Sequence, residues 1–472
     1  MENTTAKNGL VLDVHESPKK TSEWVMLSLQ HILAMFVACI TVPLIVGTSI
    51  PATIIAAGVG TLIYILFTKK KSPVVLSSSF AYIASMNIAF NLGGGQNYLA
   101  LAIGMAIVGL IYVVVALVIK KVGTGWLFKL LPTIVVGPVI MVIGLGLAGS
   151  AVSNLTSSNG SYNLIAILCG TVAMIATALT AHYGKKMLSL IPFVIGMASG
   201  YALALIFTGI GHIANWDYAK IINFAPIVDN FTNFSVTSII GYDCFAFLEF
   251  GNGAFDVAQL PTIILAFAPV AFVTICEHVG DHLNLSGIIG KDLLKDPGLS
   301  NTLLGDGVAT AASGFICGCA NTTYGENVAV VGVTKVASVS VIIVASIATI
   351  ALGLFTPLMV IVQTIPACVT GGVSLVLYGF IASSGVKMLI NEKIDLTKTR
   401  NIFIAAVILV AGIGGFSLQI PAGEQTITIS ATAVAMILGI LLNIILKDNN
   451  EKTPATEIAT NTEAPDQGSV EE

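Results

Sequence analysis

The sequence predicts an all-α integral membrane protein with many membrane-spanning segments. Of its 472 residues, 55% are hydrophobic and only 10% are charged, and the mean hydropathy is +0.92. Soluble domains carry about 25% charged residues. Apolar runs long enough to cross a bilayer recur along most of the chain, each spanning roughly 17–25 residues. These observations exclude a soluble enzyme or binding module.

Fourteen apolar segments are interpreted as spans, and we expect them to form two inverted repeats of seven. The polar residues 1–24 lead directly into the first segment, so that segment is interpreted as a span and not as a cleavable signal peptide. Small and polar residues dilute the third and tenth segments, where we expect short extended pieces. In chain order the segments are 25–46, 51–68, 73–91, 98–119, 129–150, 163–182, 188–210, 264–288, 301–317, 319–334, 338–361, 365–386, 400–417 and 425–446.

The cationic residues orient these spans. With fourteen spans both termini lie on one side, and 20 of the 21 Lys and Arg residues fall in the loops and tails of that side. Lys220 alone falls on the other side. The positive-inside rule therefore predicts a multi-pass protein of the cell membrane with both termini in the cytoplasm. The acidic tail 447–472, rich in Thr, Ala and Pro, is expected to be disordered.

Two pairs of polar segments support an internal repeat. Gln30-His31 in the first span precedes Glu277-His278 in the eighth by 247 residues. Residues 77–80 in the third span precede residues 321–324 in the tenth by 244. Seven spans per half place the ends of each half on opposite sides, so successive halves are inverted. Matched polar interruptions in two halves predict the binding site of a transporter.

The eighth span carries the sequence Glu-His-Val-Gly-Asp-His at residues 277–282. An ionisable group inside a membrane is costly and suggests a functional site. Glu277 and Asp281 are four residues apart and share one helix face, while His278 and His282 form a second such pair. Neighbouring carboxyl groups can share a proton, so at least one could exchange a proton at physiological pH. The alternative, a span that ends near Cys276, is disfavoured by the apolar residues that follow the cluster.

The tenth span carries Asn-Thr-Thr-Tyr-Gly-Glu-Asn at residues 321–327. Its first five residues favour an irregular backbone, which is tolerated at membrane depth only beside protein or a polar cavity. Free N–H groups there, close to Gly325, can donate to the carbonyls of a ligand, and Glu326 can accept from a ligand N–H. Ser79-Phe80 in the third span offers the same backbone with an aromatic face. A planar uracil-like or xanthine-like ring fits this set better than a sugar, an amino acid or an inorganic anion.

No motif for catalysis or for a metal is found. The seven cysteines are odd in number, and no spacing resembles a zinc site, with Cys317-x-Cys319 a weak candidate. No nucleophile–base set is present. We therefore expect neither an enzyme nor a cofactor, and a proton as the coupling ion.

At these motifs the chain resembles the nucleobase–ascorbate (nucleobase:cation symporter-2) transporter family, most closely its bacterial uracil permeases. The resemblance extends from about Leu27 to Lys447. It is strongest at residues 28–31, 78–81, 277–280, 321–327, 371–374 and 378–379.

The resemblance implies an inverted repeat with a core domain and a gate domain. The implied organisation is a cytoplasmic N-terminal tail 1–24, core spans 25–119, gate spans 120–210, an extracellular connection 211–263, core spans 264–361, gate spans 362–446 and a cytoplasmic tail 447–472.

The resemblance also implies roles for individual residues. Glu277 and Glu326 would hold the ring N–H groups, and the backbone amides of Phe80 and Gly325 would hold its carbonyls. The other implied binding residues are Tyr324, Ser79 and Ala38. Tyr378 lies near the implied gate. The proton-coupling candidates are Asp281, Glu277, His278 and His31.

The chain departs from the family pattern at two positions. Ala329 stands where the family signature has Gly, although Thr334 and Lys335 match it. Asp281 stands where a close uracil permease relative has His, while other family members carry Asp. The residue that carries the proton is therefore left open.

The sequence thus predicts import of uracil with a proton by alternating access, in a homodimer within the lipid bilayer, with no nucleic-acid partner. A xanthine or uric acid permease of the same family is an alternative, and Glu instead of Gln at position 326 favours uracil. An anion exchanger of this architecture is a more distant alternative, and it is disfavoured because Glu277 and Glu326 would repel the anion. A channel or receptor is disfavoured by the matched polar interruptions of the two halves.

Overall fold

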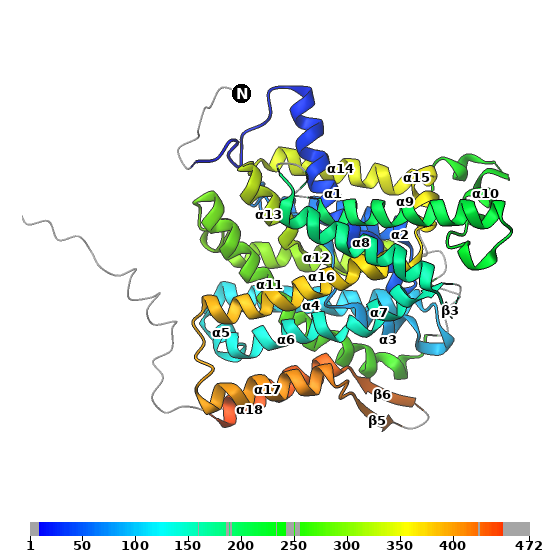
Figure 1. Cartoon of the computed structure of the whole chain (residues 1–472). Coiled ribbons are helices and arrows are strands. Elements are labelled where there is room, and N and C mark those ends of the chain that lie inside the picture. Colours follow the sequence, from blue (N-terminus) through cyan, green and yellow to red (C-terminus); the bar gives the residue numbers. More distant parts are fainter. Residues whose placement is uncertain are drawn as a thin grey trace, which may run out of the picture.

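The computed structural model describes residues 9–158, 160–185, 188, 191–232, 234–241, 250, 255–422 and 425–446. Most of these residues are helical, and many of the helices lie side by side along one direction (Figure 1). The described N-terminal segment, α5 (Gly125–Leu130) and the end of α18 (Ala431–Ile445) lie toward the left of this view. The predicted tail 447–472 lies outside the described residues.

The remaining helices follow in chain order. They are α1 (Thr21–Val46), α2 (Ile50–Phe67), α3 (Ile83–Phe90), α4 (Tyr98–Val122), α6 (Thr133–Gly146), α7 (Ala148–Thr156), α8 (Leu164–Tyr183), α9 (Pro192–Ile213), α10 (Ala225–Thr232), α11 (Leu260–Ile289), α12 (Leu299–Ile316), α13 (Gly325–Thr334), α14 (Val339–Leu354), α15 (Thr356–Gln363), α16 (Ala367–Asn391) and α17 (Thr399–Ile413). The strands form three antiparallel pairs, β1 (Leu76–Ser78) with β4 (Asn321–Thr323), β2 (Ser157–Ser158) with β3 (Ser161–Tyr162), and β5 (Leu418–Ala422) with β6 (Gln425–Ile429).

Among the described residues, eight helical stretches are long and apolar enough to cross a membrane, and three shorter apolar helices accompany them. Each predicted span coincides with one or more helices or with a strand followed by a helix. The prediction that the last span begins at residue 425 is wrong. Residues 425–429 form β6, and their alternation of polar and apolar residues has the two-residue period of a strand.

Close contacts divide most of the helices into two groups. The first group contains α1, α2, α3, α4, α11, α12, α13 and α14, and the second contains α6, α7, α8, α9, α16, α17 and α18. Glycine allows the closest approaches, because a Cβ added at Gly109 of α4 would lie 2.7 Å from the carbonyl oxygen of Gly307 in α12. The first group contains α11, which carries residues 277–282, and α13, which carries residues 325–327, and β4 packs against α2, α11 and α12 of the same group.

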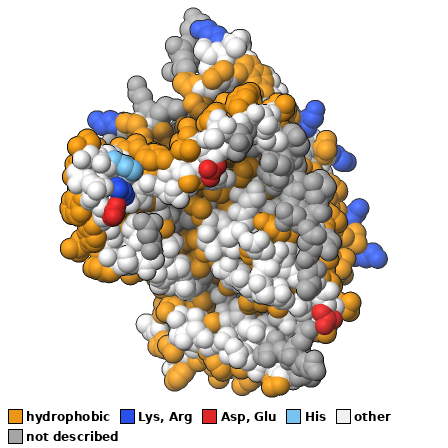
Figure 2. All heavy atoms as spheres, turned by 90° about the vertical axis from the view of Figure 1, so that its right-hand side faces the viewer, with side chains coloured by type: hydrophobic (Ala, Val, Ile, Leu, Met, Phe, Trp, Pro, Cys, Tyr) orange, Lys and Arg blue, Asp and Glu red, His pale blue; other side chains and the backbone are white. Residues whose placement is uncertain are grey.

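Among the described residues, few charged side chains lie on the end of the molecule that carries α10 and the β5–β6 hairpin. Figure 2 views this end, where uncharged and hydrophobic atoms dominate and the Lys and Arg side chains lie mostly near the rim.

The described N-terminal segment, residues 9–17, is tied to the linker that joins α13 to α14. The N–H of Val11 donates to the carbonyl of Lys335 at 2.7 Å, and the N–H of Ala337 donates to the carbonyl of Leu12 at 2.9 Å. Leu10 and Val14 are each only 1% exposed. The segment therefore packs as part of the folded structure.

Candidate functional site

The two predicted irregular segments meet each other in space. β1 and β4 pair antiparallel, with Leu76 opposite Thr323, Ser77 opposite Thr322, and Ser78 opposite Asn321. All six residues are buried. Each strand is followed by a short helix, α3 or α13, so two helices begin near the same strand pair. The extended backbone predicted in the third and tenth spans is therefore present.

Unpaired backbone donors lie beside this strand pair. The N–H of Ser79 donates to Ala320 at 2.8 Å, and the N–H of Tyr324 donates to Val75 at 3.2 Å. Within the described part of the chain, the N–H groups of Phe80 and Gly325 have no hydrogen-bond partner. Gly325 is the first residue of α13, and the first N–H groups of a helix are left unpaired by the helix itself and carry a partial positive charge. Phe80 lies three residues before α3, so its N–H is a free donor of the connecting segment. These two donors can therefore hold carbonyl oxygens of a ligand.

Three carboxyl groups lie near the start of α13. Glu277 and Asp281 extend from α11, and Glu326 lies in the first turn of α13; all three are half-buried. They are close enough for their charges to interact. Thr323 of β4 donates its hydroxyl to Asp281 Oδ2 at 2.7 Å. A Cβ added to Gly325, which is exposed, would lie 3.4 Å from Asp281 Oδ1, so α11 lies directly against the start of α13.

His31 is joined to the same helix from the other side. The side-chain amide of Asn327 in α13 donates to His31 Nδ1 at 3.0 Å and to the His31 carbonyl at 3.1 Å. His31 is only 2% exposed. The structure therefore places this predicted proton-coupling residue against α13, where it helps to hold the helix that carries Glu326.

The aromatic candidates also lie near the strand pair. The Phe80 ring packs edge-on against Tyr378 of α16, with ring centroids 6.0 Å apart. Tyr324 is the residue before α13, and its side chain is 5% exposed. Tyr378 therefore brings α16 of the second helix group into contact with the segment that follows β1.

Two smaller candidates are enclosed. The side chain of Ala38 in α1 is fully buried, next to Cys39, whose Sγ lies 3.3 Å from Ser77 Oγ of β1. Ser79 is 2% exposed, and its hydroxyl has no partner among the described residues. Ala38 therefore contributes packing behind β1, while Ser79 retains a free donor.

His278 points away from the carboxylates, toward α12. Its Nδ1 lies 2.8 Å from Asp306 Oδ2 and its Nε2 lies 3.0 Å from Thr302 Oγ1; the imidazole and the Asp306 carboxyl are fully buried. Thr302 gives its own hydrogen to the Leu299 carbonyl at 3.0 Å, so it accepts from His278 Nε2. One proton must therefore lie between His278 Nδ1 and Asp306 Oδ2. Either a protonated imidazole donates it to the Asp306 carboxylate, or a neutral Asp306 carboxyl donates it to the imidazole.

Sequence reasoning missed Asp306 and Tyr64. The Tyr64 hydroxyl of α2 lies 2.6 Å from His282 Nε2. Asp306 lies in the middle of the predicted span 301–317, and the rule that flags an ionisable residue in a membrane would also have identified it. Tyr64 carried no such signal, because an aromatic residue in an apolar helix is ordinarily a packing residue.

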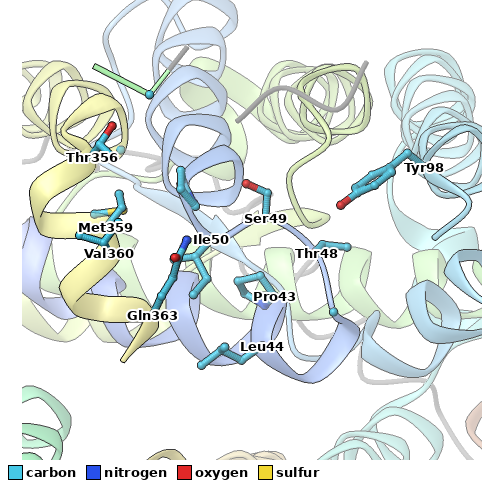
Figure 3. Close-up of a pocket in the computed structure, with 14 residues that line it drawn as sticks. Pro43, Leu44, Thr48, Ser49, Ile50, Tyr98, Thr356, Met359, Val360 and Gln363 are labelled. Atoms are coloured by element: carbon cyan, nitrogen blue, oxygen red, sulfur yellow. The ribbon is translucent and has the colours of Figure 1, made fainter. Parts of the chain in front are cut away.

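One cavity of about 560 Å³ lies elsewhere, at the end of α1 and the start of α2 (Figure 3). Uncharged residues line it, among them Ser49, Tyr98, Thr356 and Gln363. None of the predicted site residues lies in this lining. Among the described residues, no group of three or more His, Cys, Asp and Glu side chains could hold a metal ion.

The fold is that of a multi-span membrane transporter. The murine Solute Carrier 26 family member A9 anion transporter, in an inward-facing structure, superposes with a TM-score of 0.60 at 12% identity, covering 92% of this chain and 69% of that one. The transmembrane domain of the cyanobacterial bicarbonate transporter BicA gives a TM-score of 0.52 at 12% identity, covering 90% and 99%. At this identity the likeness concerns the fold alone.

Sequence similarity shows the family. Residues 22–420 match a family described as a permease family, and the chain belongs to it. The uracil permease of Bacillus caldolyticus is 41% identical over 440 residues, covering 93% of this chain and 95% of that one. The uracil permease of Bacillus subtilis (strain 168) is 39% identical over 458 residues (96% and 98%), and that of Escherichia coli (strain K12) is 36% identical over 424 residues (89% and 90%). The family resemblance predicted from the motifs is confirmed, and these relatives are permeases and not enzymes.

Proposed function

We propose that this permease imports uracil together with a proton, by alternating access around the β1–β4 strand pair. The substrate is supported by relatives named uracil permeases at 36–41% identity over most of the chain. The observation that carries the binding mode is the set of unpaired N–H groups at Phe80 and Gly325 beside three half-buried carboxyl groups. Uracil presents two ring N–H donors and two carbonyl acceptors, which complement this set.

In the proposed binding mode, Glu277 and Glu326 accept from the ring N–H groups. The amides of Phe80 and Gly325 donate to the carbonyl oxygens, and the Phe80 and Tyr324 rings offer apolar surface. Asp281, held by Thr323, is the first candidate for the coupled proton, with Glu277, His278 and His31 as the others. No cofactor is required in this scheme.

The proposal includes fourteen spans in two inverted repeats. The strand register supports it. Corresponding residues of the two halves are 244 positions apart, so Ser78 corresponds to Thr322 and Asn321 corresponds to Ser77. Ser78 pairs with Asn321, and their counterparts Thr322 and Ser77 also pair with each other. A two-fold relation between the halves has this property. The two helix groups support a core domain, 25–119 with 264–361, and a gate domain, 120–210 with 362–446. Cytoplasmic termini, the cell membrane as location and a homodimer complete the proposal.

An anion exchanger is the alternative suggested by the structural neighbours. Glu277, Asp281 and Glu326 would repel an anion at the proposed site, since like charges in a poorly solvated environment interact strongly. A xanthine or uric acid permease is the alternative suggested by the family. Both rings share the N–H and C=O pattern of uracil, so competition must decide between them.

The test is uptake of radiolabelled uracil by cells that produce the Glu326→Gln variant. We expect saturable uptake to disappear while the amount of protein in the membrane is unchanged, because an amide cannot replace a carboxylate acceptor for a ring N–H without changing the charge. The matched control is Glu392→Gln, an exposed residue after α16. Saturable uptake in Glu326→Gln would overturn the site assignment, and stronger inhibition by xanthine than by unlabelled uracil would overturn the substrate.

A further inference from the structure

The face of α11 behind the carboxylates carries two imidazoles that the transport scheme does not require for binding. We propose that His278 and His282 are positioning residues, which fix the rotation of α11 about its axis and thereby the direction of Glu277 and Asp281. The proposal rests on the proposed role of these two carboxyl groups in binding uracil.

His282 joins α11 to α2. Its Nε2 lies 2.6 Å from the Tyr64 hydroxyl, and its Nδ1 lies 2.7 Å from the His278 carbonyl oxygen. The Tyr64 hydroxyl also lies 2.8 Å from Ser72 Oγ, in the segment that leads into β1. His282, Tyr64 and Ser72 are all 0% exposed. These bonds link α11 to α2 and to the segment before the strand pair.

The direction of each bond follows from the inventory of donors. The His278 carbonyl is an acceptor, so His282 Nδ1 carries a hydrogen and donates to it. For a neutral imidazole, Nε2 then accepts from the Tyr64 hydroxyl, and the Tyr64 oxygen accepts from Ser72. Every ring nitrogen of His282 is therefore satisfied, and a single tautomer is specified.

His278 joins α11 to α12 in the same way. Its two ring nitrogens contact Asp306 and Thr302, at 2.8 and 3.0 Å. The two imidazoles stack on each other, with ring centroids 4.1 Å apart and an angle of 23° between the planes. The face of α11 behind the carboxylates is thus attached at two successive turns to two different helices of the same packing group.

Directional bonds are needed at this position because α11 is apolar over much of its surface. Apolar contacts are non-directional and specify little about rotation, whereas the hydrogen bonds of a buried polar network are directional and favour one arrangement. Glu277 and Asp281 lie on the helix face next to the one that carries His278 and His282. A rotation of α11 would therefore turn both carboxyl groups away from β4 and from the start of α13.

The experiment measures KM and maximal rate of uracil uptake for Tyr64→Phe, which removes one hydroxyl and keeps the ring. We expect KM to rise on the order of tenfold, because a rotation of α11 would weaken the hydrogen bonds between its carboxyl groups and the substrate, with the membrane level of the protein unchanged. Ser72→Ala removes the outer bond and is expected to raise KM less. Tyr201→Phe is the matched control, because it removes a hydroxyl bonded to Thr364 at 2.7 Å between α9 and the residue after α15, and its KM should equal that of the unmodified protein.

A second measurement does not depend on the substrate. Hydrogen–deuterium exchange of the purified full chain should increase in the α11 peptide that contains residues 277–286 in Tyr64→Phe, and not in Tyr201→Phe. An unchanged KM together with unchanged exchange in Tyr64→Phe would overturn the positioning role. If the unmodified protein took up no uracil, the proposed function would fail, and the exchange measurement alone would decide the positioning role.

Discussion

At the scale of single residues, Thr323 has the most direct contact with a candidate proton carrier. Its hydroxyl donates to Asp281 Oδ2 at 2.7 Å, and Thr323 itself is paired with Leu76 in the strand ladder. The bond therefore connects the strand pair to α11. A charge-assisted bond of this kind is roughly twice as strong as a neutral one.

Thr323→Val should lower the ratio of maximal rate to KM for uracil by on the order of tenfold or more, since hydrogen bonds to charged groups contribute about 1.5–3 kcal/mol. Valine has nearly the shape of threonine, so the strand pairing should persist. The control is Thr334→Val at the other end of α13, where the hydroxyl donates to the Val330 carbonyl and accepts from the N–H of Val336, and contacts no carboxyl group of the described residues. Equal transport by the two variants would show that Asp281 does not depend on this bond.

The residue scale also shows how far the sequence could lead. The four-residue spacing correctly placed Glu277 and Asp281 on one face of a helix and His278 and His282 on another. Periodicity cannot say which helix packs against each face, because the partners Asp306 and Tyr64 lie 28 and 218 residues away. The partners became visible only in the tertiary structure.

At the scale of elements, the N-terminal segment 9–17 packs against the ends of two helices of the first group. Lys291, just after α11, forms an ion pair with Asp13 at 2.7 Å, while the backbone of the segment pairs with the linker after α13. Ser338 donates to the Glu16 carbonyl at 2.5 Å. The segment therefore ties together the ends of the two helices that carry Glu277 and Glu326.

The ion pair predicts a dependence of stability on pH. Burial of the Asp13 carboxyl opposes ionisation, but the hydrogen bonds and the charge of Lys291 outweigh it and hold the pKa of Asp13 below its usual value. The stabilisation is therefore complete above the unfolded-state value of about 4 and is lost as the pH falls through the lower folded-state value. Both side chains are about one third exposed or more, so we expect a contribution of at most about 1 kcal/mol.

The measurement is thermal unfolding of the detergent-solubilised protein and of Asp13→Asn between pH 3 and pH 8. The unmodified protein should be slightly more stable near neutral pH, and the difference should vanish at the acid end. Lys291→Gln supplies the control, because combining it with Asp13→Asn should add no further loss. A difference that persisted at the acid end would exclude the ion pair as its cause.

Element boundaries were predictable where hydropathy alone decides them and unreliable elsewhere. Long apolar helices such as α4 and α8 begin and end within a few residues of the predicted limits. Strand β6 was predicted as the start of the last membrane span because the segment is apolar enough, although its alternation of polar and apolar residues indicated a strand. The small and polar residues of the third and tenth segments predicted extended backbone at β1 and β4. They did not predict that the two strands pair with each other.

At the scale of the whole molecule, the proposed mechanism requires an ion gradient to drive uptake. Membrane vesicles with an alkaline interior should accumulate uracil above the external concentration, and collapsing the pH gradient with a protonophore should abolish the accumulation. A sodium gradient of equal size, imposed without a pH gradient, serves as the control. Accumulation driven by sodium alone would replace the proton as the proposed coupling ion.

The pairing of β1 with β4 also sets an order of events during synthesis. β4 begins 243 residues after β1 ends, which at 5–20 residues per second corresponds to roughly 10–50 s of translation. Throughout that time the backbone groups of β1 lack their native partner in an environment where unpaired polar groups are costly. The first half of the chain therefore has an incomplete site until β4 has been synthesised. A chain whose translation ends before residue 321 lacks β4 and cannot assemble this site.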